Sequence, residues 1–122
     1  MTNTVLIVEN EVFVLDAMEE ILAIGGFKSI CVRDGNRGVD TYKERSNEID
    51  VVILDMNLPG LAGPEVYQVM QRVNPDVKVI VSSGYDEHDV IERFGEPRPI
   101  SILKKPFNAQ MLLERVHSVL SS

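Results

Sequence analysis

Five short runs that are rich in β-branched residues alternate along this chain with five segments of helical spacing. The runs are residues 5–8, 29–32, 51–54, 77–81 and 100–103. The run at residues 51–54 is entirely apolar, and three of its four residues are β-branched, which is typical of a strand that is buried on both faces of a sheet. Strands that alternate with helices indicate parallel pairing with a helix in each crossover. The sequence therefore predicts an α/β fold in which five parallel strands are doubly wound by five helices.

The segments between the runs differ in the strength of their helical pattern. Apolar residues line one helical face in the first, third and last segments, whereas the second (about 37–46) and fourth (about 87–94) are weaker. Asp86 and Asn108 are predicted N-caps, since short polar side chains accept hydrogen bonds from a first helical turn. The pair Gly25-Gly26 is predicted to end the first helix.

Composition limits the class of protein. A chain of 122 residues is long enough for one domain with a substantial core, so we expect a single domain over residues 1–122. A net charge of −7 disfavours direct binding to nucleic acid. The single cysteine, Cys31, permits neither an intrachain disulfide nor a CxxC metal site. Without a membrane-length apolar stretch or a signal peptide, we expect a cytoplasmic protein with no membrane partner.

Polar and charged side chains follow four of the predicted strands. In chain order they are Glu9-Asn10-Glu11, Asp55-Met56-Asn57, Ser82-Ser83-Gly84 and Lys104-Lys105-Pro106. In open parallel sheets, functional groups gather beyond the carboxyl ends of the strands. We therefore expect these acids, amides, hydroxyls and lysines to converge on one edge of the sheet.

The acidic groups predict a cation site. Asp55 taken alone is equally compatible with a turn-capping role, but carboxylates that gather at one edge need a cation or must take up a proton. Oxygen ligands without His or Cys suit Mg²⁺. Glu9 and Asn10 stand closest to the end of the first strand and are the better ligand candidates, whereas Glu11 fits the acidic start of a helix.

The hydroxyls and lysines suggest an anion close to the same site. One of Ser82 and Ser83 is a candidate donor to an anion, and the small Gly84 leaves room for its approach. Strand alternation sends Lys104 and Lys105 to opposite faces, and we expect Lys105 to point into the site. His88 and His117 lie away from the strand ends, so we expect no catalytic role for either.

Four sequence blocks, "VLIVENE", "VVILDMNLPG", "VIVSSGY" and "ILKKPF", together resemble the receiver domain of two-component response regulators. The resemblance covers essentially the whole chain and implies the five-stranded, doubly wound fold of that family. It implies that Asp55 accepts a phosphoryl group from a sensor histidine kinase or a phosphotransfer protein. It also implies that the domain relays a signal by protein contact and turns over no separate substrate.

The same resemblance implies a role for each site residue. Glu9, Asn10 and Asp55 would hold Mg²⁺ together with the backbone carbonyl of Asn57. Ser83 would be the switch hydroxyl, and Lys105 would pair with the phosphoryl oxygens. These groups suit a transition state whose negative charge is spread over phosphoryl oxygens.

Two positions depart from the family pattern. Asn10 stands where the family usually has Asp, which removes a charge from the metal site. Ile102 stands where the family usually has Tyr or Phe on the fifth strand, so no aromatic ring is present to follow the movement of Ser83.

Two other functions remain open at the level of sequence. A receiver-like binding module that is never phosphorylated is compatible with Asn10. A phosphatase of the haloacid dehalogenase type also uses a strand-end Asp and Mg²⁺. That family generally needs a second Asp two residues further on, where this chain has Asn57.

Overall fold

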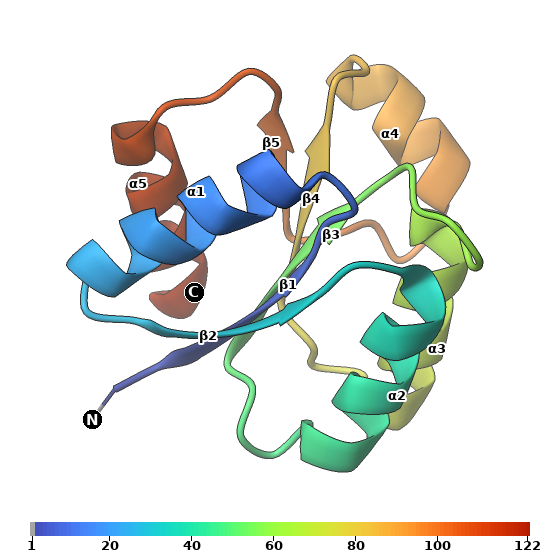
Figure 1. The fold of residues 1–122 in the computed structure, drawn as a ribbon. Helices are drawn as coiled ribbons and strands as arrows, with labels where there is room; N and C mark the ends of the chain where they lie inside the picture. Colours follow the sequence, from blue (N-terminus) through green and yellow to red (C-terminus); the bar gives the residue numbers. More distant parts are fainter. Residues whose placement is uncertain (1) are drawn as a thin grey trace.

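The computed structural model describes residues 2–122 and contains five strands and five helices that alternate along the chain (Figure 1). The strands are β1 (Thr4–Val8), β2 (Lys28–Val32), β3 (Val51–Asp55), β4 (Val79–Ser83) and β5 (Ser101–Lys104). The helices are α1 (Val12–Ile24), α2 (Gly35–Arg45), α3 (Gly63–Val73), α4 (Glu87–Phe94) and α5 (Ala109–Leu120). The predicted fold class is confirmed.

All five strands are parallel and form one sheet in the order β2-β1-β3-β4-β5. The chain first winds outward from β1 to β2 and then returns past β1 to β3, so the direction of winding reverses between β1 and β3. Ligand sites of open α/β sheets form at this reversal, beyond the carboxyl ends of the strands. The topology therefore predicts a ligand site at the residues that end β1 and β3.

Helices cover both faces of the sheet (Figure 1). α1 and α5 pack on one face, where Ile7, Ile53 and Ile80 point, while α2, α3 and α4 pack on the other, where Leu54 and Val81 point. Every residue of β3 and β4 is buried, which explains why these strands are almost continuously apolar rather than alternating.

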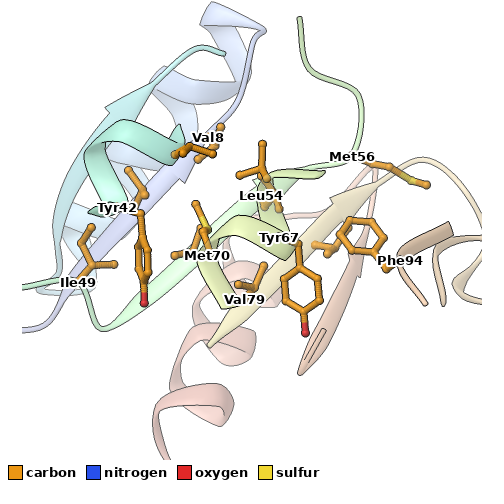
Figure 2. Close-up of a cluster of buried hydrophobic side chains, with 14 of the residues drawn as sticks. Val8, Tyr42, Ile49, Leu54, Met56, Tyr67, Met70, Val79 and Phe94 are labelled. Carbon is orange, nitrogen blue, oxygen red and sulfur yellow. The ribbon is translucent and has the colours of Figure 1, made fainter. Parts of the chain in front are cut away.

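Three aromatic side chains, Tyr42, Tyr67 and Phe94, join the mainly aliphatic core under α2, α3 and α4. Figure 2 shows Tyr42, Met70, Tyr67 and Phe94 in one cluster with Val8, Leu54 and Val79 of the sheet. The rings of Tyr67 and Phe94 meet edge to face, with their centroids 5.6 Å apart. Asn74 donates a hydrogen bond of 3.3 Å to the buried Tyr42 hydroxyl. Burial of each such side chain stabilises the fold by about 1.5–3 kcal/mol, which gives the strand ends a rigid support.

The structure shifts one predicted strand. β4 spans Val79–Ser83 instead of residues 77–81, because Val77 donates its backbone amide to Asn74 in a turn. Ser82 and Ser83 pair with Leu103 and Lys104 of β5. Backbone pairing does not depend on an apolar side chain, so the strand continues through both serines, beyond the apolar run.

The predicted helix ends have different outcomes. The Asn108 side chain caps α5 by accepting from the backbone amide of Met111 at 2.8 Å. Asp86 stands at the N-cap of α4, but its side chain makes no capping hydrogen bond. α1 ends before Gly25, and Gly26 has a φ of 88°, which glycine adopts readily.

Within residues 2–122, no helix combines the length and the apolar character that crossing a membrane requires.

Candidate functional site

Three charged side chains meet at the carboxyl edge of the sheet. Glu9 follows β1, Asp55 ends β3 and Lys105 follows β5. The Lys105 Nζ atom lies 2.9 Å from Glu9 Oε1 and 3.5 Å from Asp55 Oδ1. Glu9 is only 1% exposed and Asp55 only 8%, so both carboxylates lie largely out of contact with solvent. The fold thus places Lys105 beside two residues that lie 50 and 96 positions away in the chain, in one ionic cluster.

The pleat of the sheet explains which side chains enter this cluster. Glu9 continues the face of Ile7, and Asp55 continues the face of Ile53, so both point toward the side covered by α1 and α5. Lys105 extends β5 by donating its backbone amide to the Ser83 carbonyl at 2.8 Å. Lys104, one residue earlier, instead pairs with the exposed Asp86 at 3.0 Å.

Burial and charge both act on Asp55. Burial, followed by the nearby Glu9 carboxylate, raises the pKa of Asp55 from an ordinary 3.8 to about 6, against the opposing effects of Lys105 and a hydrogen bond from the backbone amide of Asn57. Burial opposes the charged form of Lys105, but its hydrogen bond to Glu9 and the charges of Asp55 and Glu9 outweigh it, so the pKa of Lys105 is raised. Two carboxyl groups therefore share one ammonium group in this cluster.

Two asparagines belong to the predicted metal site, Asn10 and, through its backbone carbonyl, Asn57. Asn10 and Asn57 are both exposed. The Asn10 backbone carbonyl accepts from the Arg33 guanidinium at 3.5 Å, and its side chain is not engaged by the ionic cluster. Among residues 2–122, no three His, Cys, Asp or Glu side chains form a metal-binding group. The oxygen donors present, two carboxylates with amide and backbone oxygens, fit a hard cation such as Mg²⁺ that retains several water ligands.

Ser83 lies at the end of β4 and points to the opposite face from Asp55. It is 2% exposed, and its Oγ accepts the backbone amide of Tyr85 at 2.9 Å and lies 3.5 Å from Met56 Sδ. The structure gives its hydroxyl no hydrogen bond to the side chains of Asp55, Glu9 or Lys105. Of the predicted site residues, Ser83 is thus close to the cluster in the fold but not joined to it.

The structure adds one residue, Ser82, whose role the sequence alone left unassigned. Ser82 is the parallel-register partner of Asp55 and is 1% exposed. The feature of the sequence that could have identified Ser82 is a hydroxyl residue directly after the apolar run of a central strand.

The two histidines lie elsewhere: His88 pairs with Glu92 on the exposed side of α4, and the His117 ring lies 5.2 Å from that of Phe27.

Comparison with known proteins decides the family. The sequence model of the response regulator receiver domain matches residues 5–117. This chain belongs to the response regulator receiver domain family. The relationship expected from the four sequence blocks is thereby confirmed.

Relatives of this receiver domain occur both as short proteins and as parts of long ones. A cyclic di-GMP phosphodiesterase of Thermotoga maritima is 34% identical over 109 residues, which are 89% of this chain but only 28% of that protein. Sporulation initiation phosphotransferase F of Bacillus subtilis is 27% identical over 121 residues and is covered to 95%. Sensor kinase CckA of Brucella abortus is covered to only 12%. The similarity therefore concerns the receiver domain and not the remainder of the longer proteins.

Solved structures of other receiver proteins have the same fold as this chain. A receiver domain protein from Clostridium thermocellum superposes with a TM-score of 0.89 at 25% identity, over 98% of this chain and 94% of the other. A CheX-CheY-BeF3-Mg²⁺ complex from Borrelia burgdorferi matches with a TM-score of 0.88 at 28% identity, over 96% of this chain and 88% of the other. The receiver architecture of this chain is therefore that of its relatives.

Proposed function

We propose that this receiver domain accepts a phosphoryl group on Asp55 from a phosphohistidine of a sensor kinase or a phosphotransfer protein. The observation that carries the proposal is the position of the Asp55 carboxylate, which ends a central strand with the Lys105 ammonium group 3.5 Å away. A cation at that distance can stabilise charge that develops on phosphoryl oxygens during transfer.

The transfer is a direct displacement at phosphorus. One Asp55 carboxylate oxygen forms a bond to phosphorus while the bond from phosphorus to the histidine nitrogen of the donor breaks, and the electron pair returns to that imidazole. A pKa of about 6 leaves Asp55 mostly ionised at neutral pH, as a nucleophile must be. Lys105 turns from Glu9 toward the incoming phosphoryl oxygens.

Glu9, Asn10, Asp55 and the Asn57 backbone carbonyl are the groups that would hold Mg²⁺ in this proposal. The ion would supply positive charge to a site where two carboxylates and a phosphoryl group come together. The name of a neighbouring structure, a CheX-CheY-BeF3-Mg²⁺ complex, supports the choice of Mg²⁺ as the cation in this proposal. Asn10 contributes an oxygen without a charge, so its share of the binding energy is smaller than that of Asp.

The signal then passes to another protein by contact rather than by turnover of a substrate. Ser83 is the proposed switch hydroxyl, because its rotation toward the phosphoryl group releases the backbone amide of Tyr85. A cytoplasmic location forms part of the same proposal and accords with the single free thiol, Cys31.

Mass spectrometry tests the phosphoacceptor directly. The protein is incubated with acetyl phosphate and Mg²⁺, and the intact mass is compared with those of Asp55→Asn and Asp50→Asn. Asp50 immediately precedes β3 and accepts the backbone amide of Thr4, so it provides the same substitution at the opposite end of the strand. We expect one phosphoryl group on the parent and on Asp50→Asn, and none on Asp55→Asn. Equal labelling of Asp55→Asn contradicts the proposal.

The exposed Asn10 supports one alternative, a receiver-like binding module that is not phosphorylated. Beryllofluoride, which mimics a phosphoryl group on a carboxylate, separates the two functions. A working phosphoacceptor gives Mg²⁺-dependent amide chemical-shift changes around Asp55 and Ser83, and a binding module gives none. The haloacid dehalogenase alternative predicts turnover of a generic phosphate ester, and membership of the receiver family argues against it.

A further inference from the structure

The Ser82 hydroxyl has no hydrogen-bond partner, although the residue is only 1% exposed. Among residues 2–122, only one other buried side-chain oxygen, that of Ser29, is in the same position. A buried hydroxyl without a partner destabilises the fold, and most such groups in proteins are satisfied. The fold does not need a hydroxyl between Ile80 and Leu103, since an alanine would fill nearly the same space.

Ser82 lies next to Asp55 on the adjacent strand. The two residues are register partners in the β3–β4 pair, and neighbouring strands lie about 4.8 Å apart. Ile53 and Ile80, two residues before each of them, point into the core beneath α1 and α5. Asp55 and Ser82 therefore project from the same face of the sheet, whereas Ser83 projects from the other.

The hydrogen bonds of Asp55 explain when this hydroxyl is needed. In the resting structure the carboxylate has the Lys105 ammonium group and the backbone amide of Asn57 as donors. Lys105 is shared with Glu9 and must turn to a phosphoryl oxygen during transfer. Asp55 is then left with one donor fewer at a position that is only 8% exposed to water.

We propose that Ser82 is a positioning residue of the phosphoacceptor site, whose hydroxyl donates to the Asp55 carboxyl group once Lys105 has turned to the phosphoryl group. One carboxyl oxygen must face phosphorus, and a donor to the other oxygen, alongside the Mg²⁺ that this oxygen would hold, fixes the plane of the group. The proposal requires the Ser82 hydroxyl to turn about the Cα–Cβ bond toward its register partner Asp55. The absence of a partner in the resting state follows, because the hydroxyl serves a different state.

This inference rests on the proposed function, and Ser82→Ala tests it. Ser29→Ala is the matched control, since it removes the other unpartnered hydroxyl, from β2, in register with Val5 at the opposite end of the sheet. Ser82→Thr retains the hydroxyl and should restore what alanine loses. Beryllofluoride affinity in the presence of Mg²⁺, the rate of labelling by acetyl phosphate, and the urea midpoint without either reagent are measured for all four proteins.

We expect Ser82→Ala to bind beryllofluoride about five- to tenfold more weakly and to be labelled more slowly by a similar factor, as the loss of one neutral hydrogen bond predicts. Its urea midpoint should equal or exceed that of the parent, because no resting hydrogen bond is removed. A purely structural role would instead lower the midpoint and leave affinity and labelling unchanged. Ser29→Ala and Ser82→Thr should retain parental affinity.

The outcomes separate this inference from the proposed function. If the parent binds beryllofluoride and is labelled on Asp55, but Ser82→Ala matches it in both measurements, only the role of Ser82 is wrong. If Ser29→Ala loses as much affinity as Ser82→Ala, the effect is not specific to the site and the inference is likewise overturned. A parent that neither binds beryllofluoride nor is labelled contradicts both.

Discussion

Lys105 bonds Glu9 more closely than Asp55, at 2.9 Å against 3.5 Å, and Glu9 is the more deeply buried of the two carboxylates. In the resting protein the lysine therefore acts chiefly as the counter-ion of Glu9. In the proposed function, a phosphoryl group on Asp55 would draw the same ammonium group away and leave Glu9 without it. A second cation is most needed at that moment, so phosphorylation and cation binding at this site should favour each other.

Replacement of Lys105 by alanine should weaken both the resting fold and the phosphorylated state. The variant leaves Glu9 and Asp55 buried together without a positive charge. Removal of one partner from a fully buried ion pair lowers the free energy of unfolding by about 3–5 kcal/mol. Because Lys105 is partly exposed, Lys105→Ala should lower it by less, roughly 2 kcal/mol. Beryllofluoride affinity should fall more than tenfold, because the ammonium group no longer reaches the phosphoryl mimic. Urea unfolding and a beryllofluoride titration measure the two effects.

Lys104→Ala is the matched control for this prediction. Lys104 precedes Lys105 in the chain but pairs with the exposed Asp86 on the other face of the sheet. Exposed ion pairs contribute about 0–1 kcal/mol, so this variant should remain close to the parent in stability and affinity. A larger loss of affinity for Lys104→Ala than for Lys105→Ala would show that the wrong lysine has been assigned.

The raised pKa of Asp55 makes its ionisation unfavourable to the resting fold. With a folded-state pKa of about 6 against an ordinary 3.8, the folded protein holds the proton more tightly than the unfolded chain does. Stability relative to Asp55→Asn should therefore fall as the pH rises from about 4 to about 6 and change little above that range. Two pKa units correspond to about 3 kcal/mol, which is an upper value for a pair of coupled carboxylates.

Urea unfolding of the parent and Asp55→Asn at intervals between pH 4 and pH 8, without Mg²⁺, measures this dependence. The asparagine variant should be the more stable protein at pH 7 and should lose that advantage as the pH falls. Asp86→Asn controls for the substitution itself at an exposed position. An advantage for Asp55→Asn that is constant with pH, or that grows on acidification, would disprove the burial of an ionised carboxylate.

The sequence predicts the architecture because the apolar runs alone determine which segments are buried. Val51, Val52, Ile53 and Leu54 leave no polar face, so β3 can only be a central strand of a covered sheet. The convergence of Glu9, Asp55 and Lys105 also follows from sequence, since parallel strands place all their carboxyl ends at one edge. The family resemblance then supplies roles that spacing alone does not.

Sequence could not predict how this cluster divides its contacts. Whether Lys105 lies nearer to Glu9 or Asp55 depends on backbone positions at the level of a few tenths of an ångström, which no pattern of residue types encodes. The extent of β4 was also missed, because the strand continues through Ser82 and Ser83 after its apolar residues end. That Ser82 lies beside Asp55 follows only from the register of β3 and β4 in the structure.

The β4–α4 loop should respond to a phosphoryl mimic through Ser83. Its Oγ accepts the backbone amide of Tyr85, and the Arg93 side chain of α4 lies 4.5 Å over the Tyr85 ring. Beryllofluoride should draw the Ser83 hydroxyl away and shift the amide resonances of Tyr85 and its neighbours. In Ser83→Ala those shifts should be lost, and affinity should fall about fivefold, as expected for one hydrogen bond.

The same titration tests the consequence of Ile102. An aliphatic side chain on β5 packs against the core but has no ring to reorient, so shifts on β5 should be small compared with those of the loop. Ile102→Ala should lower stability by about 1–3 kcal/mol through lost packing while it leaves the Tyr85 response intact. Large shifts on β5 that disappear in Ile102→Ala would instead identify Ile102 as a working switch residue.

Asn10→Asp should strengthen Mg²⁺ binding, because it adds a negative charge at the predicted metal site while nearly preserving the shape of the side chain. Two unit charges about 4 Å apart interact by roughly 4 kcal/mol at an effective dielectric near 20. Added repulsion among the carboxylates, screening by salt and the water that Mg²⁺ retains should reduce the gain to about 1–2 kcal/mol, or ten- to thirtyfold in affinity.

Calorimetric titration with Mg²⁺ at fixed ionic strength measures the effect of Asn10→Asp, with Asn47→Asp as the control. Asn47 is exposed between α2 and β3, so the control makes the same change of net charge away from the cluster. We expect Asn47→Asp to bind Mg²⁺ like the parent, since an exposed charge more than a Debye length from the site is largely screened. An equal gain in both variants would mean that net charge alone attracts the ion. Equal affinities for Asn10→Asp and the parent would mean that residue 10 does not contact the metal and that another acid, such as Glu11, supplies the charge.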